Sequence, residues 1–321
     1  METPRRYPLI FNPTAHSQKD GKVRRFLESH AHRFTVHATT HAGAARELAA
    51  RFAAHGEPVV IAAGGDGTLN EVVSGLAGSA TVLGVLPAGT MNVFARELAL
   101  PLNSLAHAFT VIEHGCVREV DLFEANGSPF VQMAGVGFDA AVIEETTWQS
   151  KKLLGPLAYL LAAVKVMGEQ PPHIEVLCAD GRREHGVAVI VGNGALYGGH
   201  FKFFRNAHNR DSKLDVLVYK EAGYRLVLDS LRGLACGGID LLESTSSFQT
   251  SAFTVRADRE VPVEVDGELL GRFTEVHFQE TANCLRVFAP ENPPPASLAA
   301  SWKSLLPWQR HQPQLPTTRN P

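Results

Sequence analysis

The stretch from Pro58 to Asn70 places a glycine-rich loop between a predicted strand and a predicted helix, and it constrains the fold more than any other segment. Val59 to Ile61 form a short β-branched run, typical of a strand that is buried on both faces. Apolar residues then recur at helical spacing from Leu69 to Leu76. Between the two runs, Gly64-Gly65-Asp66-Gly67-Thr68 surrounds one carboxylate with three glycines. Because such a backbone can approach a ligand closely beside the N–H groups of a helix start, the pattern predicts a phosphate-binding loop.

Asp66 narrows the choice of ligand. An acidic residue in a phosphate-binding loop repels its ligand unless a cation or a sugar hydroxyl stands between them, so Asp66 indicates a Mg²⁺-nucleotide. The loop lacks the Lys-Ser/Thr ending of a P-loop and the spacing of the dinucleotide fingerprint. Taken alone, the glycines also fit a plain turn between strand and helix.

Length and composition limit the possible classes of protein. At 321 residues the chain is long enough to bury a large core and to hold two domains. Hydrophobic residues at 45% and charged residues at 20% describe a globular protein, and a net charge of −3 argues against a nucleic-acid partner. The four cysteines are far apart and form no Cys-x-x-Cys pair, which fits a reducing compartment and no zinc site.

The sequence contains no predicted signal peptide or membrane-spanning helix. Its first residues lead directly into a strand and lack an apolar core, so we expect a cytoplasmic protein. The longest apolar stretch, Leu153 to Met167, is interrupted by Gly155-Pro156 and falls short of the ~20 residues that a spanning helix requires. It is preceded by Lys151 and Lys152, so it is a candidate surface for reversible contact with a membrane, although packing against the second domain is an equally good interpretation.

Residues 7 to 100 alternate strand and helix, which predicts an α/β domain over residues 1–115 with a parallel sheet and helices on both faces. A ligand is then expected at the carboxyl ends of the strands. The expected strands are Tyr7 to Phe11, Phe34 to Ala38, Val59 to Ile61 and Val82 to Leu86, and the expected helices are Lys22 to Ser29, Ala44 to Ala54, the one after the glycine loop and one from about Met91.

From about residue 116 the pattern changes to β-rich runs separated by turn signals. Asn126-Gly127, Asp180-Gly181 and Asp266-Gly267 are hairpin dipeptides, so residues 116–290 are predicted to form an antiparallel, sandwich-like β-domain. Helical stretches near Ala140 to Met167 and Tyr224 to Leu234 interrupt it. Residues 291–321 are rich in proline and polar residues and are expected to form a disordered tail.

A series of further motifs gives the sequence a resemblance to a known family. In chain order they are Asn12-Pro13, Thr40, the glycine loop with Asn70-Glu71, Pro87 to Asn92 with Phe94-Ala95-Arg96, Gly135 to Asp139, Asn193-Gly194, Tyr197-Gly198-Gly199, Asp211 with Leu214-Asp215, and Val265 to Glu268. In this order, and over nearly the whole chain except the tail, they resemble the diacylglycerol kinase family of lipid kinases, particularly its soluble bacterial members, which are related to sphingosine kinases.

The resemblance implies that the first domain binds ATP and that the β-rich domain completes a cleft for the lipid. Thr40 and Thr90 lie just beyond strand ends, where their hydroxyls can reach ribose or phosphate. Both threonines could equally serve as helix N-caps, a role that is compatible with nucleotide contact. The implied nucleotide-binding residues are Asn12, Thr40, Gly64, Gly65, Asp66, Gly67, Thr68, Leu69, Asn70 and Thr90.

The resemblance also implies a structural Mg²⁺ held by the Asp211 carboxylate with the backbone carbonyls of His208 and Lys213. Hard cations accept such oxygen sets. From spacing alone, Asp211-Ser212 is a turn before a strand, so only the family supports this metal.

The catalytic base has three acidic candidates. Val261, Val263 and Val265 alternate with polar residues, which predicts a strand with one buried face that delivers Asp266 and Glu268 at a tight turn. Without the resemblance, Asp266-Gly267 would be a plain hairpin turn. In similar bacterial lipid kinases the glutamate that matches Glu268 is regarded as the proton acceptor with the aspartate that matches Asp266 close by, whereas the sphingosine kinases point to the residue that matches Asp66. We favour Glu268.

The resemblance therefore implies an ATP-dependent lipid kinase that uses Mg²⁺, acts on a diacylglycerol-like or related lipid and touches the membrane only peripherally. Two alternatives stay open: a nicotinamide dinucleotide kinase, because those enzymes also use a Gly-Gly-Asp-Gly loop and a β-rich domain, and a non-catalytic nucleotide- or lipid-binding regulator on the same fold. A homodimer is among the assemblies that the sequence allows, and the identity of the lipid does not follow from it.

Overall fold

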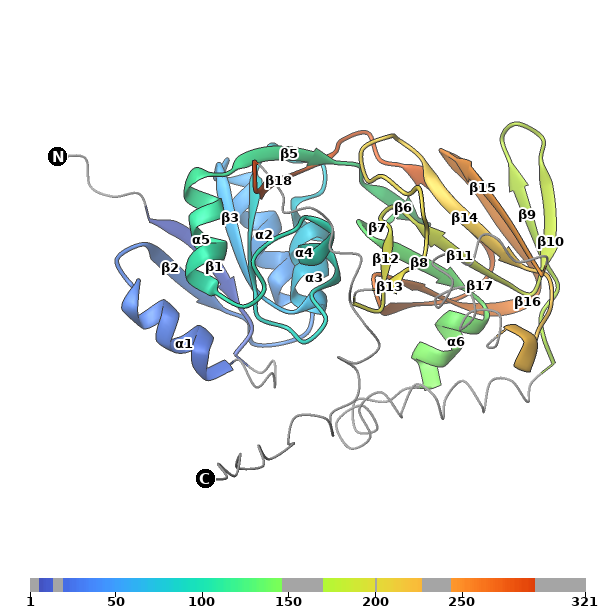
Figure 1. Cartoon of the computed structure of the whole chain (residues 1–321), viewed down its shortest axis with the longest axis horizontal. Helices are drawn as coiled ribbons and strands as arrows, with labels where there is room; N and C mark the ends of the chain where they lie inside the picture. The colour runs from blue at the N-terminus through green and yellow to red at the C-terminus, as the bar shows by residue number, and fades with distance from the viewer. Residues whose placement is uncertain (1–5, 14–19, 146–169, 200, 227–243, 292–321) are drawn as a thin grey trace, which may run out of the picture.

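The computed structural model describes residues 6–13, 20–145, 170–199, 201–226 and 244–291, and these residues form two domains side by side, each built on one large sheet (Figure 1). The first sheet has the strand order β2-β1-β3-β4-β18-β5. Its elements are β1 (Tyr7–Phe11), α1 (Asp20–Ser29), β2 (Phe34–Ala38), α2 (Ala44–Ala54), β3 (Val59–Gly64), α3 (Asp66–Leu76), β4 (Val82–Pro87), α4 (Val93–Glu97), α5 (Leu105–His114), β5 (Cys116–Val120) and β18 (Leu285–Ala289).

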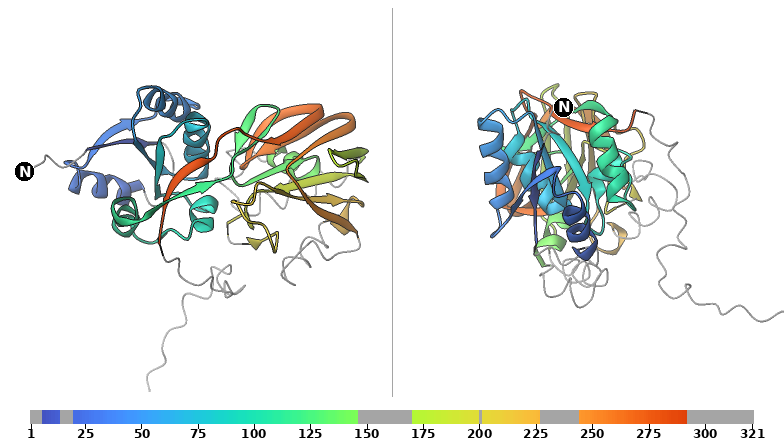
Figure 2. Two further views of the ribbon diagram at one scale, coloured as in Figure 1. Left: turned by 90° about the horizontal axis from the view of Figure 1, so that it is seen from above. Right: turned by 90° about the vertical axis from the view of Figure 1, so that its left-hand side faces the viewer.

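Helices cover both faces of the first sheet, as the alternation of strand and helix predicts. In β3, Val60 and Ala62 pack with α2 and α3 on one face, whereas Val59, Ile61 and Ala63 pack with α1 and α5 on the other. Figure 2 shows the two helical layers on either side of the sheet. Because β1 to β4 are mutually parallel in the order 2-1-3-4, their carboxyl ends meet at one edge, which is where the glycine loop lies.

Two helices of this domain differ from the sequence-based expectation. The helix expected from about Met91 begins only at Val93, because Asn92 adopts a left-handed conformation with φ 49° and its side chain bonds back to Gly89. Helix α5 was not expected. It begins after Ser104, whose hydroxyl caps it by accepting the N–H of His107.

The expected boundary at residue 116 also requires correction. Strands β5 and β18, which the sequence assigned to the β-rich domain, complete the first sheet, where β18 lies between β4 and β5. The two strands pair antiparallel from Leu285–Val120 to Ala289–Cys116. The chain therefore crosses between the domains twice, and the second domain is inserted between two adjacent strands of the first.

The second domain contains a ten-stranded sheet in which all pairs are antiparallel. The three hairpin dipeptides are confirmed: Asn126-Gly127, Asp180-Gly181 and Asp266-Gly267 each lie at a turn between paired strands, with a positive φ at the glycine in every case. The strands are β6 (Phe123–Ala125), β7 (Ser128–Phe130), β8 (Met133–Val136), β9 (Ile174–Cys178), β10 (Arg183–Gly186), β11 (Ala188–Gly192), β14 (Leu214–Tyr219), β15 (Thr245–Thr250), β16 (Ala252–Val265) and β17 (Glu268–Glu280), with β12 (Leu196–Tyr197) and β13 (Phe201–Lys202) as a separate pair.

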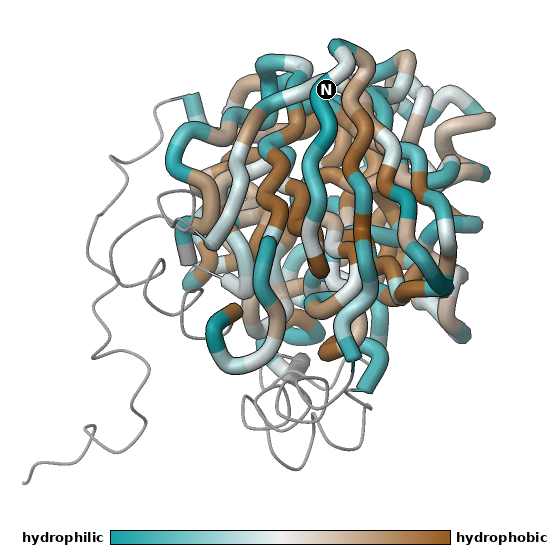
Figure 3. The backbone as a smooth tube through the Cα atoms, turned by 90° about the vertical axis from the view of Figure 1, so that its right-hand side faces the viewer, coloured by the Kyte–Doolittle hydropathy of each residue, from teal (hydrophilic) through white to brown (hydrophobic). Residues whose placement is uncertain are grey.

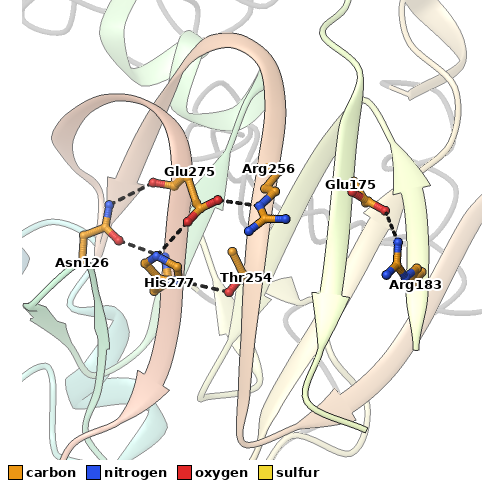
Figure 4. A network of polar contacts seen from close by, with 7 residues as sticks. All are labelled: Asn126, Glu175, Arg183, Thr254, Arg256, Glu275 and His277. Carbon is orange, nitrogen blue, oxygen red and sulfur yellow. Dashed lines mark hydrogen bonds and ion pairs between the residues drawn. The ribbon is translucent and has the colours of Figure 1, made fainter. Parts of the chain in front are cut away.

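One face of the second sheet packs in the core of this domain. The outer face is polar along β9, β10 and much of β16 and β17, but apolar along β11 and β14, where Ile190, Leu217 and Tyr219 are buried. Hydrophobic and hydrophilic stretches alternate along the strands of this domain (Figure 3). On the outer face, Arg256 of β16 pairs with Glu275 of β17, which also contacts His277, and Arg183 of β10 pairs with Glu175 of β9 (Figure 4). Such exposed cross-strand pairs keep this part of the outer face in solvent.

Helix α6 (Phe138–Glu145) follows β8 and lies at the start of the expected helical stretch near Ala140 to Met167. The apolar stretch Leu153 to Met167, most of the stretch Tyr224 to Leu234 and the tail after residue 291 lie outside the described residues. Among the helices that the structure describes, none has the length and apolar character needed to cross a bilayer.

Candidate active site

The glycine loop is shorter than its motif, because β3 ends at Gly64 and helix α3 begins at Asp66, which leaves only Gly65 between them. A Cβ on Gly64 would lie 2.6 Å from Cβ of Thr68, so only glycine lets the helix start so close to the strand. A Cβ on Gly89 would lie 2.5 Å from the Cα of Gly65. The loops after β3 and β4 therefore touch backbone to backbone, and the helix N-terminus opens beside them.

Asp66 joins these two loops. Its carboxylate accepts the N–H of Asn92 at 2.9 Å and the N–H of Val93 at 2.7 Å, which are the first free donors of α4. Burial raises the pKa of Asp66, while these two bonds and the nearby Arg96 act in the opposite direction. Each carboxylate oxygen thus already has one donor, and Asp66 serves as the cap that fixes α4 against the loop.

The other predicted nucleotide-binding residues gather at the same edge of the sheet. Asn12 follows β1 and is half-buried, while Thr40 and Thr90 are exposed beyond β2 and β4. The Asn70 side chain is buried, and its Oδ1 has no hydrogen-bond donor among the described residues. An orphaned acceptor at this position fits a donor group of a bound nucleotide. Leu69 is different, because its side chain packs in the domain core and only its backbone could contact a ligand.

Asp266 occupies the turn between β16 and β17 and binds backbone rather than pointing into open space. Its carboxylate accepts the N–H groups of Val131, Gln132 and Met133, each at 2.9 Å. Burial raises the pKa of Asp266 to about 6; the three N–H bonds act against this, and the negative charge of Asp66 adds to it. The two aspartates, one from each domain, therefore lie close enough to repel one another.

Glu268 lies where the two domains meet. A Cβ added to Gly67 would lie 2.9 Å from Oε1 of Glu268, so this carboxylate rests directly against the first turn of α3. The Glu268 side chain is exposed, whereas Asp266 is held by the backbone N–H groups beneath the turn. Of the three acidic candidates, Glu268 is the one that the structure brings to the glycine loop from the opposite side.

A second contact between the domains was not predicted. Glu97 of α4 accepts the Nε2–H of Gln132 at 2.9 Å and the backbone N–H of Leu196 at 3.0 Å. Through Asp66 and Glu97, the short helix α4 is bonded to the glycine loop at one end and to the second domain at the other. No sequence pattern indicates this role, because Glu97 reads as an ordinary polar residue of an amphipathic helix.

The strand before the turn also differs from the prediction. The alternation of Val261, Val263 and Val265 predicted that their neighbours face solvent, but Glu264 is only 1% exposed and Pro262 is buried as well. β16 is covered on this side by α6, whose Asp139 approaches Glu264, and the hydroxyl of Tyr197 donates to Asp139 Oδ1. A glutamate between four buried strand residues is the signal that could have indicated this.

The residues predicted to hold a structural Mg²⁺ lie in the turn before β14. Asp211 is half-buried and its Oδ1 accepts the N–H of Lys213 at 3.1 Å, while His208 is exposed. Ser212 adopts a left-handed conformation with φ 55°, and its N–H donates to Asp121 at 2.7 Å. Within the described ranges there is no cluster of three or more His, Cys, Asp or Glu side chains suited to a metal, so a cation here would need the backbone carbonyls that were predicted.

A parallel-sheet domain with a glycine loop, facing an acidic turn from an antiparallel β-domain, is the architecture of NAD kinase-like and diacylglycerol kinase-like proteins. A solved diacylglycerol kinase of Bacillus anthracis superimposes with a TM-score of 0.69 at 23% identity, over 90% of this chain and 98% of that one. An NAD kinase of Archaeoglobus fulgidus, solved in complex with ATP, gives 0.52 at 12% identity over 89% and 94%. At these identities the likeness establishes the fold.

Sequence comparison identifies the family within this class. Residues 6–125 match the diacylglycerol kinase catalytic domain, and residues 132–289 match the YegS C-terminal NAD kinase beta sandwich-like domain. A diacylglycerol kinase of Bacillus subtilis is 32% identical over 71% of this chain and 80% of its own length, and one of Staphylococcus aureus is 30% identical over 90% and 93%. The "Probable lipid kinase YegS-like" of Pseudomonas fluorescens is 33% identical over 81% and 86%. The chain belongs to the diacylglycerol kinase family.

Proposed function

We propose that this protein is an ATP-dependent lipid kinase that transfers the γ-phosphoryl group of ATP to the hydroxyl of a diacylglycerol-like lipid. The observation that carries the proposal is the contact of the Glu268 carboxylate with Gly67 at the start of α3. A carboxylate in this place can accept the proton of an attacking hydroxyl while the loop and helix start hold the phosphates. The names of the bacterial relatives support a lipid as the acceptor.

The roles of the site residues follow from their contacts. The backbone N–H groups at the start of α3 bind phosphate, and the buried Oδ1 of Asn70 receives a donor from the nucleotide. Asp66 fixes the backbone at the start of α4, Asp266 fixes the backbone before β8, and Glu268 acts as the base. Mg²⁺ bound with ATP would supply positive charge that offsets the negative charge of the phosphates.

We also propose that Asp211, with the carbonyls of His208 and Lys213, binds a structural Mg²⁺. Its contribution is tested by thermal unfolding with and without MgCl₂. The wild type should be stabilised by Mg²⁺ at concentrations where Asp211→Asn is not, because a ligand that binds only the folded state raises its stability. Equal stabilisation of both proteins contradicts this site.

A lipid substrate requires access to a bilayer, and we propose reversible peripheral contact in a cytoplasmic enzyme that acts alone or as a homodimer. Co-sedimentation with anionic liposomes at low and high salt tests the contact, and sedimentation velocity tests the assembly. No binding at low salt by an enzyme that is active on micellar lipid contradicts the membrane contact.

The decisive experiment offers radiolabelled ATP with diacylglycerol, monoacylglycerol, sphingosine, phosphatidylglycerol and NAD in parallel. Label in a lipid product supports the proposal and names the lipid. The shared fold with an ATP-bound NAD kinase favours one competing function, and label in NADP alone would establish it. Tight ATP binding with no acceptor labelled would instead indicate a non-catalytic regulator.

A further inference from the structure

Two carboxyl groups face each other directly beneath the turn that carries Glu268. Glu264 of β16 stands opposite Gly135 of β8 in the register of the two strands. A Cβ on Gly135 would lie 2.8 Å from Oδ2 of Asp139 and 3.0 Å from Oε1 of Glu264. The missing side chain of Gly135 therefore provides the space in which Asp139 and Glu264 meet.

The two outer oxygens of this pair each accept a hydrogen bond from a group outside it. Glu264 Oε2 accepts the N–H of Gly267 at 2.8 Å, and Asp139 Oδ1 accepts the hydroxyl of Tyr197. Asp139 Oδ2 is buried and has no donor in the part of the chain that the structure describes. Two carboxylate oxygens can face each other in such a place only if one of them carries a proton, because two buried anions in contact repel strongly.

The charged and titratable groups around the pair favour this protonation. Burial raises the pKa of Glu264 well above its ordinary value, the nearby charge of Asp139 adds to it, and Asp266 in the turn raises it further. Burial also raises the pKa of Asp139. From the other packed elements, β12 contributes Tyr197 and β14 contributes Tyr219, and burial next to these acids raises the pKa of the Tyr197 phenol, so this phenol remains a neutral donor.

We propose that Glu264 and Asp139 share one proton and act as positioning residues for phosphoryl transfer, holding the Gly267 N–H so that the turn presents Glu268 to the glycine loop. This inference rests on the proposed kinase function. Glu264 itself is buried below the turn and does not reach the reacting atoms, so its effect passes through Gly267 to the adjacent Glu268. When the shared proton is lost at alkaline pH, the two anions separate, the bond to Gly267 loosens and kcat falls.

The amide variant Glu264→Gln removes the titratable proton but keeps the hydrogen bond that positions Gly267. Its carbonyl oxygen can still accept from Gly267, and its amide can donate permanently to Asp139 in place of the shared proton. We expect kcat at neutral pH within about threefold of the wild type, and an alkaline decline of kcat that is shifted upward or lost. Glu260→Gln, an exposed acid on the same strand, should leave the whole pH profile unchanged.

The apolar variant Glu264→Leu removes the acceptor for Gly267. It should lower kcat by about tenfold at all pH values while KM for ATP stays within about twofold, because the nucleotide loop belongs to the other domain. If Glu264→Leu does not fold, Asp139→Asn replaces it and should behave like Glu264→Gln. A profile of Glu264→Gln that coincides with the wild type at alkaline pH overturns the proposal.

A readout that needs no enzymatic activity separates this inference from the kinase function. Labelling with ¹³C-carbonyl aspartate and ¹⁵N-glycine selects the four Asp-Gly pairs of the sequence, one of which is Asp266-Gly267. In the wild type the Gly267 amide resonance should move in an alkaline step with the titration of the pair, apart from any step near pH 6 from the adjacent Asp266. That alkaline step should be absent in Glu264→Gln. An alkaline step of the Gly267 resonance that is identical in both proteins overturns the shared proton, whether or not any lipid is phosphorylated.

Discussion

Asp66 of the first domain and Asp266 of the second both use their carboxylates to accept backbone N–H groups. The two aspartates differ in how far along the chain these N–H groups lie. Asp66 accepts N–H groups that lie 26 and 27 residues ahead, in the next β–α unit of the same domain. Asp266 accepts N–H groups that lie 133 to 135 residues before it. Both aspartates therefore fix backbone, whereas Glu268 contacts the other domain at Gly67.

This difference shows that acids in a motif need not share a role. Asp66 closes a local structure that adjacent elements form by themselves, while Asp266 can be satisfied only when the strands of the second domain have assembled around it. We expect substitutions to separate these functions into chemistry at Glu268, stability at Asp266 and loop geometry at Asp66.

Glu268→Gln should have the largest effect that is confined to the chemical step. The change keeps the volume of the side chain and removes the base, so kcat should fall by ~10²-fold or more while ATP affinity and melting temperature stay nearly unchanged. Steady-state kinetics and nucleotide titration measure both. Near-normal kcat in Glu268→Gln, beside an inactive Asp66→Asn that still binds ATP, would transfer the role of base to Asp66.

The free energies of unfolding of Asp266→Asn and Asp66→Asn test whether the number of accepted N–H groups sets the contribution of each aspartate to stability. An amide opposes N–H donors with its own NH₂, and we expect a loss of about 2–3 kcal/mol for Asp266, which has three donors, and about 1–2 kcal/mol for Asp66, which has two. Urea unfolding measures both, with the exposed Asp180→Asn as control. Asp66→Asn should also stop turnover while the protein stays folded. Equal losses at the two sites would mean that the number of donors does not decide the cost.

Gly67→Ala tests the contact between the domains. The added methyl group would lie 2.9 Å from Glu268 Oε1 and should displace that carboxylate, which we expect to lower kcat about tenfold. Stability should not fall, because alanine is the better helix former. Gly21→Ala, in a helix with open space around the new methyl group, is the matched control. Unchanged kcat in Gly67→Ala would show that the contact between Glu268 and the glycine loop is not needed for turnover.

The titration of Asp266 should report the nearby charge of Asp66. Its folded pKa of about 6 lies above the unfolded value of about 3.9, so the stability that this group contributes is fully present below pH ~4 and is lost as the pH rises through 6. Carboxyl NMR should find this titration, at a lower pH in Asp66→Asn. An unchanged midpoint in Asp66→Asn would show that the two carboxylates do not interact.

Arg256→Gln should have the smallest effect. Arg256 and Glu275 are exposed on the outer face of the second sheet, where solvent screens their attraction, so the melting temperature should change by less than about 1 °C and kcat not at all. A clear loss of stability in differential scanning calorimetry would show that the exposed ion pair contributes to the stability of the second domain.

The first domain was largely predictable because its information is local. Strand and helix periods alternate within short windows, and most of the predicted elements between Tyr7 and Leu86 are present within a few residues of their expected bounds. The three hairpin turns were equally readable, since Asn-Gly and Asp-Gly favour the positive φ values found there. The positions of β5 and β18 were not, because no local pattern tells a strand which sheet it joins.

The site was predictable as a set of residues but not as a set of contacts. The motifs named Asp66, Asp266 and Glu268, yet only the folded chain shows that the aspartates bind backbone N–H groups. Glu264 was misread because period-2 alternation assumes that one face of a strand meets solvent, and α6 covers that face. Contacts such as Glu97 to Leu196 join residues 99 positions apart, and no sequence window contains both.

The insertion of the second domain between β5 and β18 has a consequence for biosynthesis. A ribosome releases the strands β1 to β5 first, but the strand that belongs between β4 and β5 emerges only after residue 284. The nascent first domain must therefore wait, with an incomplete sheet, while the whole inserted domain is made. Once folded, the inserted domain brings its two ends together and places β18 beside β5. Folding of the later part of the chain therefore lowers the entropic cost of completing the sheet of the earlier part.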